Sequence, residues 1–150
     1  MYSIPVPDSY GYVLLSCLVG HLVANTMMSG AVMEARKTFQ IGYPNCYATP
    51  GYHDKADEFN RVQRGHMNYF EQLTCFTACA LIGGLKHPWL SVASSVFFHL
   101  GSIFYQKGYA DLKLDVKMAR YKKGGGLKYI GFFTAIGTTI SLSGSICGWW

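Results

Sequence analysis

The stretch GYVLLSCLVGHLVANTMMSGAVM, residues 11–33, contains no Asp, Glu, Lys or Arg. At about 1.5 Å of rise per residue, a helix of this length reaches roughly 34 Å, enough to cross a hydrocarbon core of ~30 Å with some tilt. A helix of a soluble four-helix bundle would carry charged residues along one face, and this stretch carries none. The sequence therefore predicts a membrane-spanning helix here.

Three further stretches resemble the first one. Residues 87–106 and 129–150 lack charged side chains, and residues 67–85 are apolar apart from Glu71. We predict helical spans near residues 10–33, 60–85, 88–108 and 127–149. A chain of 150 residues has room for one domain. The sequence therefore predicts an all-α, integral-membrane four-helix bundle that forms a single domain over residues 1–150, with both termini on the same side.

The charged residues indicate the orientation of this bundle. Twelve of the 13 Lys and Arg residues lie within residues 36–64 and 107–128, and Lys86 is the exception. Basic loops stay on the cytosolic side of a membrane or on its organellar equivalent, so both basic loops should share one side and both termini the other. Because topology explains the net charge of +5, we expect membrane lipid and no nucleic acid as a partner. The N-terminal residues lack the basic character of a signal or transit peptide, so the first span should be a permanent anchor.

The two basic loops differ in character. Residues 34–58 are rich in Gly and Pro, which favours a structured, turn-rich connection. Residues 110–123 alternate apolar and charged positions, which predicts an interfacial amphipathic turn or two before the glycine run 124–126. The five cysteines have no metal-site spacing, so we expect no metal.

Polar residues form a stripe at the start of the second span. Arg61, Arg64, Asn68, Glu71 and Cys75 follow one another at steps of 3, 4, 3 and 4, which places them on one helical face. An ionisable group at this depth is expensive and faces the bundle or a polar cavity. Either Glu71 pairs with a cation of a neighbouring helix, or the stripe forms a ligand site. The Arg and the Asn on the same stripe favour the ligand site.

A second stripe lies at the end of the third span, where Ser102, Tyr105 and Tyr109 share a face. On their own these tyrosines are typical of an interfacial aromatic belt. Together the two stripes would line a pocket in which cations and an amide suit carboxylates, and Glu71 suits an ammonium group. Such a pocket fits a small zwitterionic, net-anionic molecule that enters from the basic side.

The pattern F-N-x-x-Q-R-x-H-x-N-x-x-E at residues 59–71 resembles the helix-two motif of the membrane-associated proteins in eicosanoid and glutathione metabolism, the MAPEG family. The resemblance extends to EARKTF (34–39), YP (43–44), HP (87–88) and YQKGY (105–109), and is closest to the type 3 microsomal glutathione transferases. It implies homotrimers that bind glutathione as a co-substrate between adjacent subunits, near the cytosolic face.

The resemblance also implies roles for single residues. Arg64 and Asn68 would hold the carboxylate end of glutathione, and Glu71 its amino group. Tyr105 and Tyr109 would border the site. Further binding positions fall on Arg36, Lys37 and His66.

Two positions depart from the family pattern. Ser102 stands where the family usually has an Arg, and the Arg that stabilises the glutathione thiolate just before helix four has no clear counterpart. The loop reads MARYKKGGG (118–126), so Arg120, Lys122 and Lys123 are the candidates. A cation beside a thiol lowers its pKa from about 8.5 and raises its reactive fraction at neutral pH.

These observations predict a membrane-bound glutathione transferase or peroxidase that acts on lipophilic electrophiles or lipid hydroperoxides. We expect it in the endoplasmic reticulum or in an organellar membrane, mitochondrial or plastid. The alternative is a catalytically weakened relative that serves as a structural accessory subunit of a larger membrane complex. A transporter fits less well, because four short spans with one polar stripe offer little of a transport path.

Overall fold

The computed structural model of the chain describes residues 5–149, and this part contains helices and no strand. The elements are α1 (Tyr10–Leu14), the π-helix η1 (Leu15–Val19), α2 (Gly20–Phe39), α3 (Ala56–Gly84), α4 (Pro88–Ala110), α5 (Val116–Lys122) and α6 (Leu127–Cys147). Because α1, η1 and α2 follow one another without a break, they form one long helical segment. The prediction of an all-α chain is confirmed.

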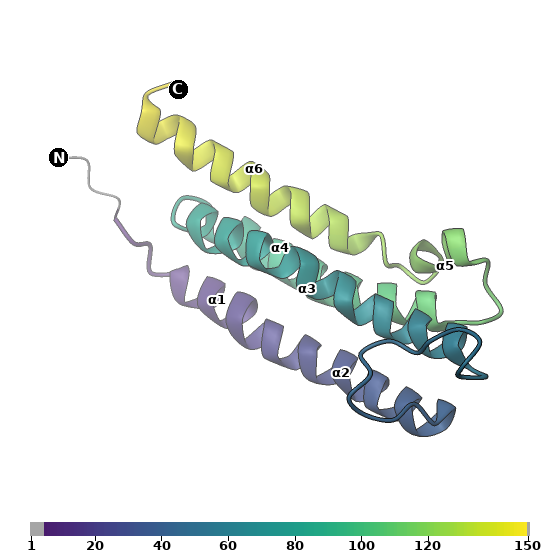
Figure 1. Cartoon of the computed structure of the whole chain (residues 1–150). Coiled ribbons are helices and arrows are strands. Elements are labelled where there is room, and N and C mark those ends of the chain that lie inside the picture. Colours follow the sequence, from purple (N-terminus) through teal and green to yellow (C-terminus); the bar gives the residue numbers. More distant parts are fainter. Residues whose placement is uncertain (1–4, 150) are drawn as a thin grey trace.

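The long helices lie side by side along a common direction (Figure 1). The loops 40–55 and 111–126 lie together at one end of the molecule, which we call the loop end. The start of α1, the turn between α3 and α4 and the end of α6 lie at the other end. The two basic loops therefore share one end, as the charge distribution predicts.

The helices at the loop end are longer than the predicted spans. α2 continues to Phe39, α3 already begins at Ala56, and α4 reaches Ala110. The spans were predicted from stretches without charged residues. A helix can continue past a charged residue, so the ends of these stretches do not give the ends of the helices. α2 stops where Gln40 adopts a left-handed conformation (φ 56°) and the N–H of Ile41 donates to an earlier carbonyl of the last turn.

α6 ends two residues before the predicted end of the fourth span. The predicted span reached residue 149, whereas the helix stops at Cys147 because Gly148 takes a φ of 70°. This left-handed glycine is a common helix terminator. Trp149 follows in the exposed turn, and Trp150 lies outside the described residues.

Two helical segments, Tyr10–Phe39 and Leu127–Cys147, are long and apolar enough to cross a membrane. α3 and α4 are long enough but less apolar. α3 carries charged residues throughout its first half, and α4 carries several serines together with His99 and Gln106. Length and composition therefore support two of the four predicted spans, and the polar residues of α3 and α4 need a structural explanation.

The polar side chains of α4 connect it to its neighbours. Ser91 Oγ donates to the Ala80 carbonyl of α3 at 2.7 Å, and Ser94 Oγ donates to the Gly131 carbonyl of α6 at 2.7 Å. Gln106 Nε2 donates to the Met28 carbonyl of α2 at 3.0 Å. In an apolar environment such bonds satisfy polar groups that would otherwise be buried without partners. α4 is therefore the central helix.

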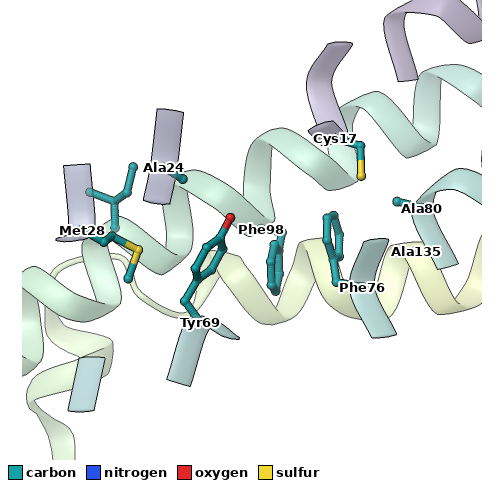
Figure 2. Close-up of a cluster of buried hydrophobic side chains, with 9 residues drawn as sticks. Cys17, Ala24, Met28, Tyr69, Phe76, Ala80, Phe98 and Ala135 are labelled. Atoms are coloured by element: carbon teal, nitrogen blue, oxygen red, sulfur yellow. The ribbon is translucent and has the colours of Figure 1, made fainter. Parts of the chain in front are cut away.

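Aromatic side chains fill the middle of the bundle. Phe76 of α3 and Phe98 of α4 stack with their ring centroids 3.9 Å apart. Cys17 lies beside this pair, and Tyr69 and Met28 continue the cluster toward the loop end (Figure 2). All five side chains are buried. Their burial supplies the apolar contact that holds the helical segment of α1, η1 and α2 against α3 and α4.

A hydrogen-bonded chain crosses this core. His21 Nδ1 lies 2.8 Å from the Tyr69 hydroxyl, which lies 3.0 Å from His99 Nδ1. His99 Nε2 lies 3.2 Å from the Cys17 carbonyl in η1. A Cβ on Gly20 would lie 2.9 Å from the His99 ring, so the absence of a side chain there lets His99 reach the helix. The π-helix therefore lies where an imidazole from α4 contacts the first helical segment.

α4 and α6 approach each other until their backbones touch. A Cβ on Gly101 of α4 would overlap the backbone nitrogen of Lys128, and one on Gly131 of α6 would lie 2.5 Å from the backbone nitrogen of Phe98. Glycines at these positions remove the side chains that would otherwise separate the two helices. The contact brings the first turn of α6 onto α4 near its loop end.

Replacing Gly101 by Ala should lower the free energy of unfolding by about 1–3 kcal/mol, because α4 and α6 must separate to admit the methyl group. Gly137→Ala in α6 is the matched control, since a Cβ there meets no atom within 4 Å. That control should be neutral or stabilising by about 0.4–1 kcal/mol. Reversible unfolding of the detergent-solubilised protein, followed by circular dichroism, measures both variants. Equal stabilities for the two would contradict the close approach.

Candidate functional site

The first half of α3 brings three predicted site residues into direct contact. The guanidinium of Arg64 forms a two-point ion pair with the carboxylate of Glu71, in which Nη2 lies 3.2 Å from Oε2. Both side chains are 46% exposed. Asn68 lies between them in sequence, and its Nδ2 donates to Glu71 Oε2 at 3.3 Å. The spacing of 4 and then 3 residues on one helix is what allows these contacts.

A buried lysine that the sequence analysis did not assign to the site completes this arrangement. Lys128, in the first turn of α6, is 0% exposed. Its Nζ donates to Asn68 Oδ1 at 2.7 Å and lies 4.6 Å from the centroid of the Tyr105 ring. The rings of Phe98 and Tyr129 lie farther from Nζ, at 5.9 and 5.6 Å. Aromatic faces stabilise a desolvated cation.

The four side chains of Arg64, Glu71, Asn68 and Lys128 form a continuous series of contacts, which we call the polar chain. Its geometry fixes the Asn68 amide, because the oxygen must accept from Lys128 and the nitrogen must donate to Glu71. Two cations and one carboxylate leave a formal charge of +1. The polar chain therefore favours a ligand with a net negative charge and at least one cationic group.

The polar chain bears on the alternative that Glu71 merely pairs with a cation of a neighbouring helix. Glu71 pairs with Arg64 of its own helix, and only Asn68 lies between it and the cation of α6. The carboxylate is half exposed, so it remains accessible from outside the bundle. This accessibility favours the ligand site.

The tyrosines of α4 lie beside the polar chain. The rings of Tyr105 and Tyr109 stack with centroids 6.2 Å apart, and Tyr105 is buried against Lys128. A hydrogen bond to Tyr105 raises the pKa of Arg120, and the guanidinium of Arg120 also lies 5.2 Å from the Tyr121 ring. Its Nε is buried without a hydrogen-bond partner among the described residues. Arg120 therefore contacts Tyr105, which in turn contacts Lys128 of the polar chain.

The other two candidate cations of this loop have different surroundings. Lys123 Nζ forms an ion pair with Asp111 Oδ2 at 2.7 Å, and this hydrogen bond holds the pKa of the Asp111 carboxyl below its usual value. Lys122 is exposed on α5. Of the three candidates from the sequence, only Arg120 touches a site tyrosine, and Lys128 joins it as a cation beside the same ring.

A cavity of about 710 Å³ opens at the loop end next to this site. It is lined by Tyr47, Asp57, Glu58, Asn60, Arg61, Arg64, Tyr109, Leu112 and Val116. Arg64 and Tyr109 are the predicted site residues in this wall. Tyr47 of the first loop lies in the same wall as Arg64. A ligand in the cavity would meet cations, carboxylates and phenols together.

Arg61 belongs to the predicted stripe but has a structural role. Its Nε donates to the Tyr109 carbonyl at 2.7 Å, and its Nη2 donates to the Asp111 carbonyl at 2.8 Å and to the Leu114 carbonyl at 3.2 Å. Backbone carbonyls at a helix C-terminus lack partners within the helix. Arg61 therefore fastens the end of α4 and the loop that follows it to α3.

Three further predicted residues make their contacts elsewhere. Arg36 donates to the Asn45 carbonyl at 2.7 Å and lies over the rings of Tyr43 and Phe59, which organises the first loop. His66 Nε2 lies 3.0 Å from Asn25 Oδ1 and connects α3 to α2. Lys37 is exposed. Within one chain, the structure does not bring these three residues to the polar chain.

An all-α bundle with two helical segments long and apolar enough to cross a membrane is consistent with a membrane protein. The chain belongs to the MAPEG family, whose family model matches residues 14–147. The match includes every residue of the polar chain and all of α2 to α6. The family resemblance seen in the sequence is therefore confirmed.

The polar chain predicts an asymmetry between two substitutions. Asn68→Leu should destabilise the protein by about 2–3 kcal/mol, because it leaves the Lys128 ammonium buried without a hydrogen-bond acceptor. Lys128→Met removes the buried charge and fills the space with an apolar chain, so it should cost clearly less, or stabilise. Unfolding in detergent measures both. If the double variant were no more stable than Asn68→Leu alone, the pairing would be contradicted.

Proposed function

We propose that this protein is a membrane-bound glutathione transferase or peroxidase that acts on lipophilic electrophiles or lipid hydroperoxides. The observation that carries the proposal is the polar chain, in which Arg64, Asn68 and Glu71 come together beside the buried Lys128. MAPEG family members generally use glutathione, which makes it the expected co-substrate. Family membership gives no support to the alternative of an accessory subunit.

The proposed setting is a four-span bundle in the endoplasmic reticulum or an organellar membrane. Tyr12 and Trp89 stack at 5.4 Å at the end opposite the basic loops, and Trp149 is exposed there too, as expected for an interfacial belt. α3 would be tolerated in the bilayer because its charged side chains pair with each other or lie near the loop end. The type 3 microsomal glutathione transferases remain our proposed closest relatives.

Glutathione would bind by exchanging partners with the Arg64–Glu71 pair. A ligand carboxylate replaces Glu71 on the guanidinium, and the ligand's ammonium group replaces Arg64 on the carboxylate. Half-exposed ion pairs contribute only about 0–1 kcal/mol, so opening the pair costs little. Both protein charges remain paired afterwards, which is why a zwitterion suits this site better than a simple anion.

The proposed oligomer is a homotrimer in which a second copy covers the exposed side of α3. The half exposure of Arg64 and Glu71 in one chain supports this arrangement, because a neighbour would desolvate the bound ligand. Arg36 and Lys37, which make no contact with the polar chain of their own subunit, would then approach it from the neighbour.

The chemical step needs a cation near the glutathione sulfur. Arg120 and Lys128 both lie beside Tyr105. A thiolate held there would attack the electrophilic carbon of a substrate, forming a C–S bond while the leaving group departs or the added electron pair is protonated. With a lipid hydroperoxide it would attack the terminal oxygen, the O–O bond would break to release the lipid alcohol, and a second glutathione would reduce the resulting sulfenic acid to the disulfide and water. Lys122 and Lys123 are weaker candidates, because one is exposed and the other pairs with Asp111.

Arg64→Ala should weaken glutathione binding by about 2–4 kcal/mol, since it removes the partner of the ligand carboxylate. Glu71→Gln should weaken glutathione binding but spare analogues that lack the amino group. Lys107→Gln removes an exposed charge at the loop end that lies outside the cavity wall, and serves as the control. Isothermal titration calorimetry in detergent gives the affinities. Unchanged affinity in both site variants would rule out this pocket.

Removing the thiolate cation should change reactivity without changing affinity. We expect Arg120→Gln to raise the pKa of the bound glutathione thiol toward its free value of about 8.5, so the rate should fall more at pH 7 than at pH 9. Lys128→Gln should raise the same pKa if Lys128 is the cation, but it should also weaken binding, because Lys128 orients Asn68. Ultraviolet thiolate titration measures this pKa, with Lys122→Gln as control. A wild-type protein that binds glutathione and leaves its thiol pKa unchanged would exclude the catalytic proposal but not the binding site.

A further inference from the structure

α5 is held firmly against the end of α4. Ala119 is fully buried, and its carbonyl lies so close to Gly108 that a Cβ there would overlap it. Asp115 caps the helix by accepting from the backbone N–H of Lys117 at 3.3 Å, and Lys123 pairs with Asp111 at 2.7 Å. These contacts fix which side of α5 faces outward.

The outward side carries apolar and basic residues together. Leu112, Val116 and Met118 are 53%, 47% and 51% exposed. Lys117 and Lys122 are exposed as well, and within residues 5–149 their side chains form no hydrogen bond or ion pair. These five residues, which we call the α5 surface, differ from Arg120 and Lys123, whose charged groups are already engaged.

The acidic groups near the α5 surface do not neutralise it. Asp111 is occupied by Lys123, and the Asp115 side chain caps α5. Glu58 pairs with Lys55, and Asp57 lies with Glu58 in the wall of the cavity that Leu112 and Val116 also line. Lys117, Lys122 and the exposed Lys113 beside Leu112 form no ion pair among the described residues, so the cations without an ion-pair partner outnumber Asp57 where apolar side chains are also exposed.

We propose that the α5 surface binds the headgroups of anionic phospholipids. The apolar side chains would enter the boundary between headgroups and acyl chains, and Lys117 and Lys122 would reach the lipid phosphates above them. Anionic lipids enrich the cytoplasmic leaflet, which is the side expected for basic loops. An acidic protein would match the lysines but not the three apolar side chains placed among them.

This inference rests on the proposed membrane setting. Leu112 and Val116 also line the cavity next to the proposed glutathione site, so the variants change only the lysines, which lie outside the cavity wall. Because each juxtamembrane lysine contributes about 1 kcal/mol to binding an anionic surface, loss of two should weaken the affinity on the order of 10- to 30-fold. The bound lipid should also stabilise the protein, since it binds the folded state.

The experiment uses the full chain in a neutral detergent, titrated with phosphatidylglycerol or with phosphatidylcholine, and follows the thermal unfolding midpoint. We expect phosphatidylglycerol to raise the midpoint and phosphatidylcholine to leave it nearly unchanged, with the difference reduced at high salt. Lys117→Gln/Lys122→Gln should remove the difference. Lys117→Arg/Lys122→Arg should keep it, because the charges remain.

Lys107→Gln controls for loss of charge elsewhere at the same end, and inorganic phosphate tests whether a free anion suffices. An equal response of wild type and the Gln double variant to phosphatidylglycerol would overturn the proposal. So would stabilisation by inorganic phosphate alone, or by a soluble acidic polypeptide in place of lipid. Glutathione binding by the same samples is measured separately, so failure of the lipid proposal and failure of the glutathione proposal give different results.

Discussion

The buried ammonium group of Lys128 is the constraint on which the loop end of the bundle depends. A charge removed from water requires compensation, and here it comes from Asn68 on α3 and Tyr105 on α4, while Lys128 itself is on α6. The backbone contact between Gly101 and Lys128 brings α6 close enough for this to occur. Sliding any of the three helices by one turn would separate the partners. The same contacts of Lys128 therefore depend on the register of the three helices and hold the site residues in place.

Local spacing along one helix could be predicted from the sequence. Arg64, Asn68 and Glu71 follow helical steps, and the structure brings their side chains together. The turn of amphipathic helix in the second loop was also predicted and is α5. In each case the interacting residues are at most seven positions apart, so helical geometry alone determines their relation.

Contacts between helices could not be predicted in this way. Lys128 lies within the predicted fourth span, near residues 127–149, but it was not predicted as a site residue, because its partner Asn68 lies 60 positions away in the sequence. Arg61 lines the cavity beside Arg64, as the stripe predicted, but its bonds to carbonyls at the end of α4 could not be foreseen from the spacing. Hydropathy likewise cannot reveal that Ser91 and Ser94 of α4 bond to neighbouring helices. A helix such as α4 therefore looks too polar for a span until its partners are known.

The hydrogen-bonded chain through the core has a fixed proton direction. The Cys17 carbonyl can only accept, so a neutral His99 carries its proton on Nε2 and accepts from the Tyr69 hydroxyl at Nδ1. The Tyr69 oxygen then accepts from His21 Nδ1, which leaves His21 Nε2 without a proton. One backbone carbonyl thus selects the tautomers of two histidines on different helices. At the partly exposed His21 end, a hydroxyl or a water that donates can extend the chain, whereas a group that only accepts cannot.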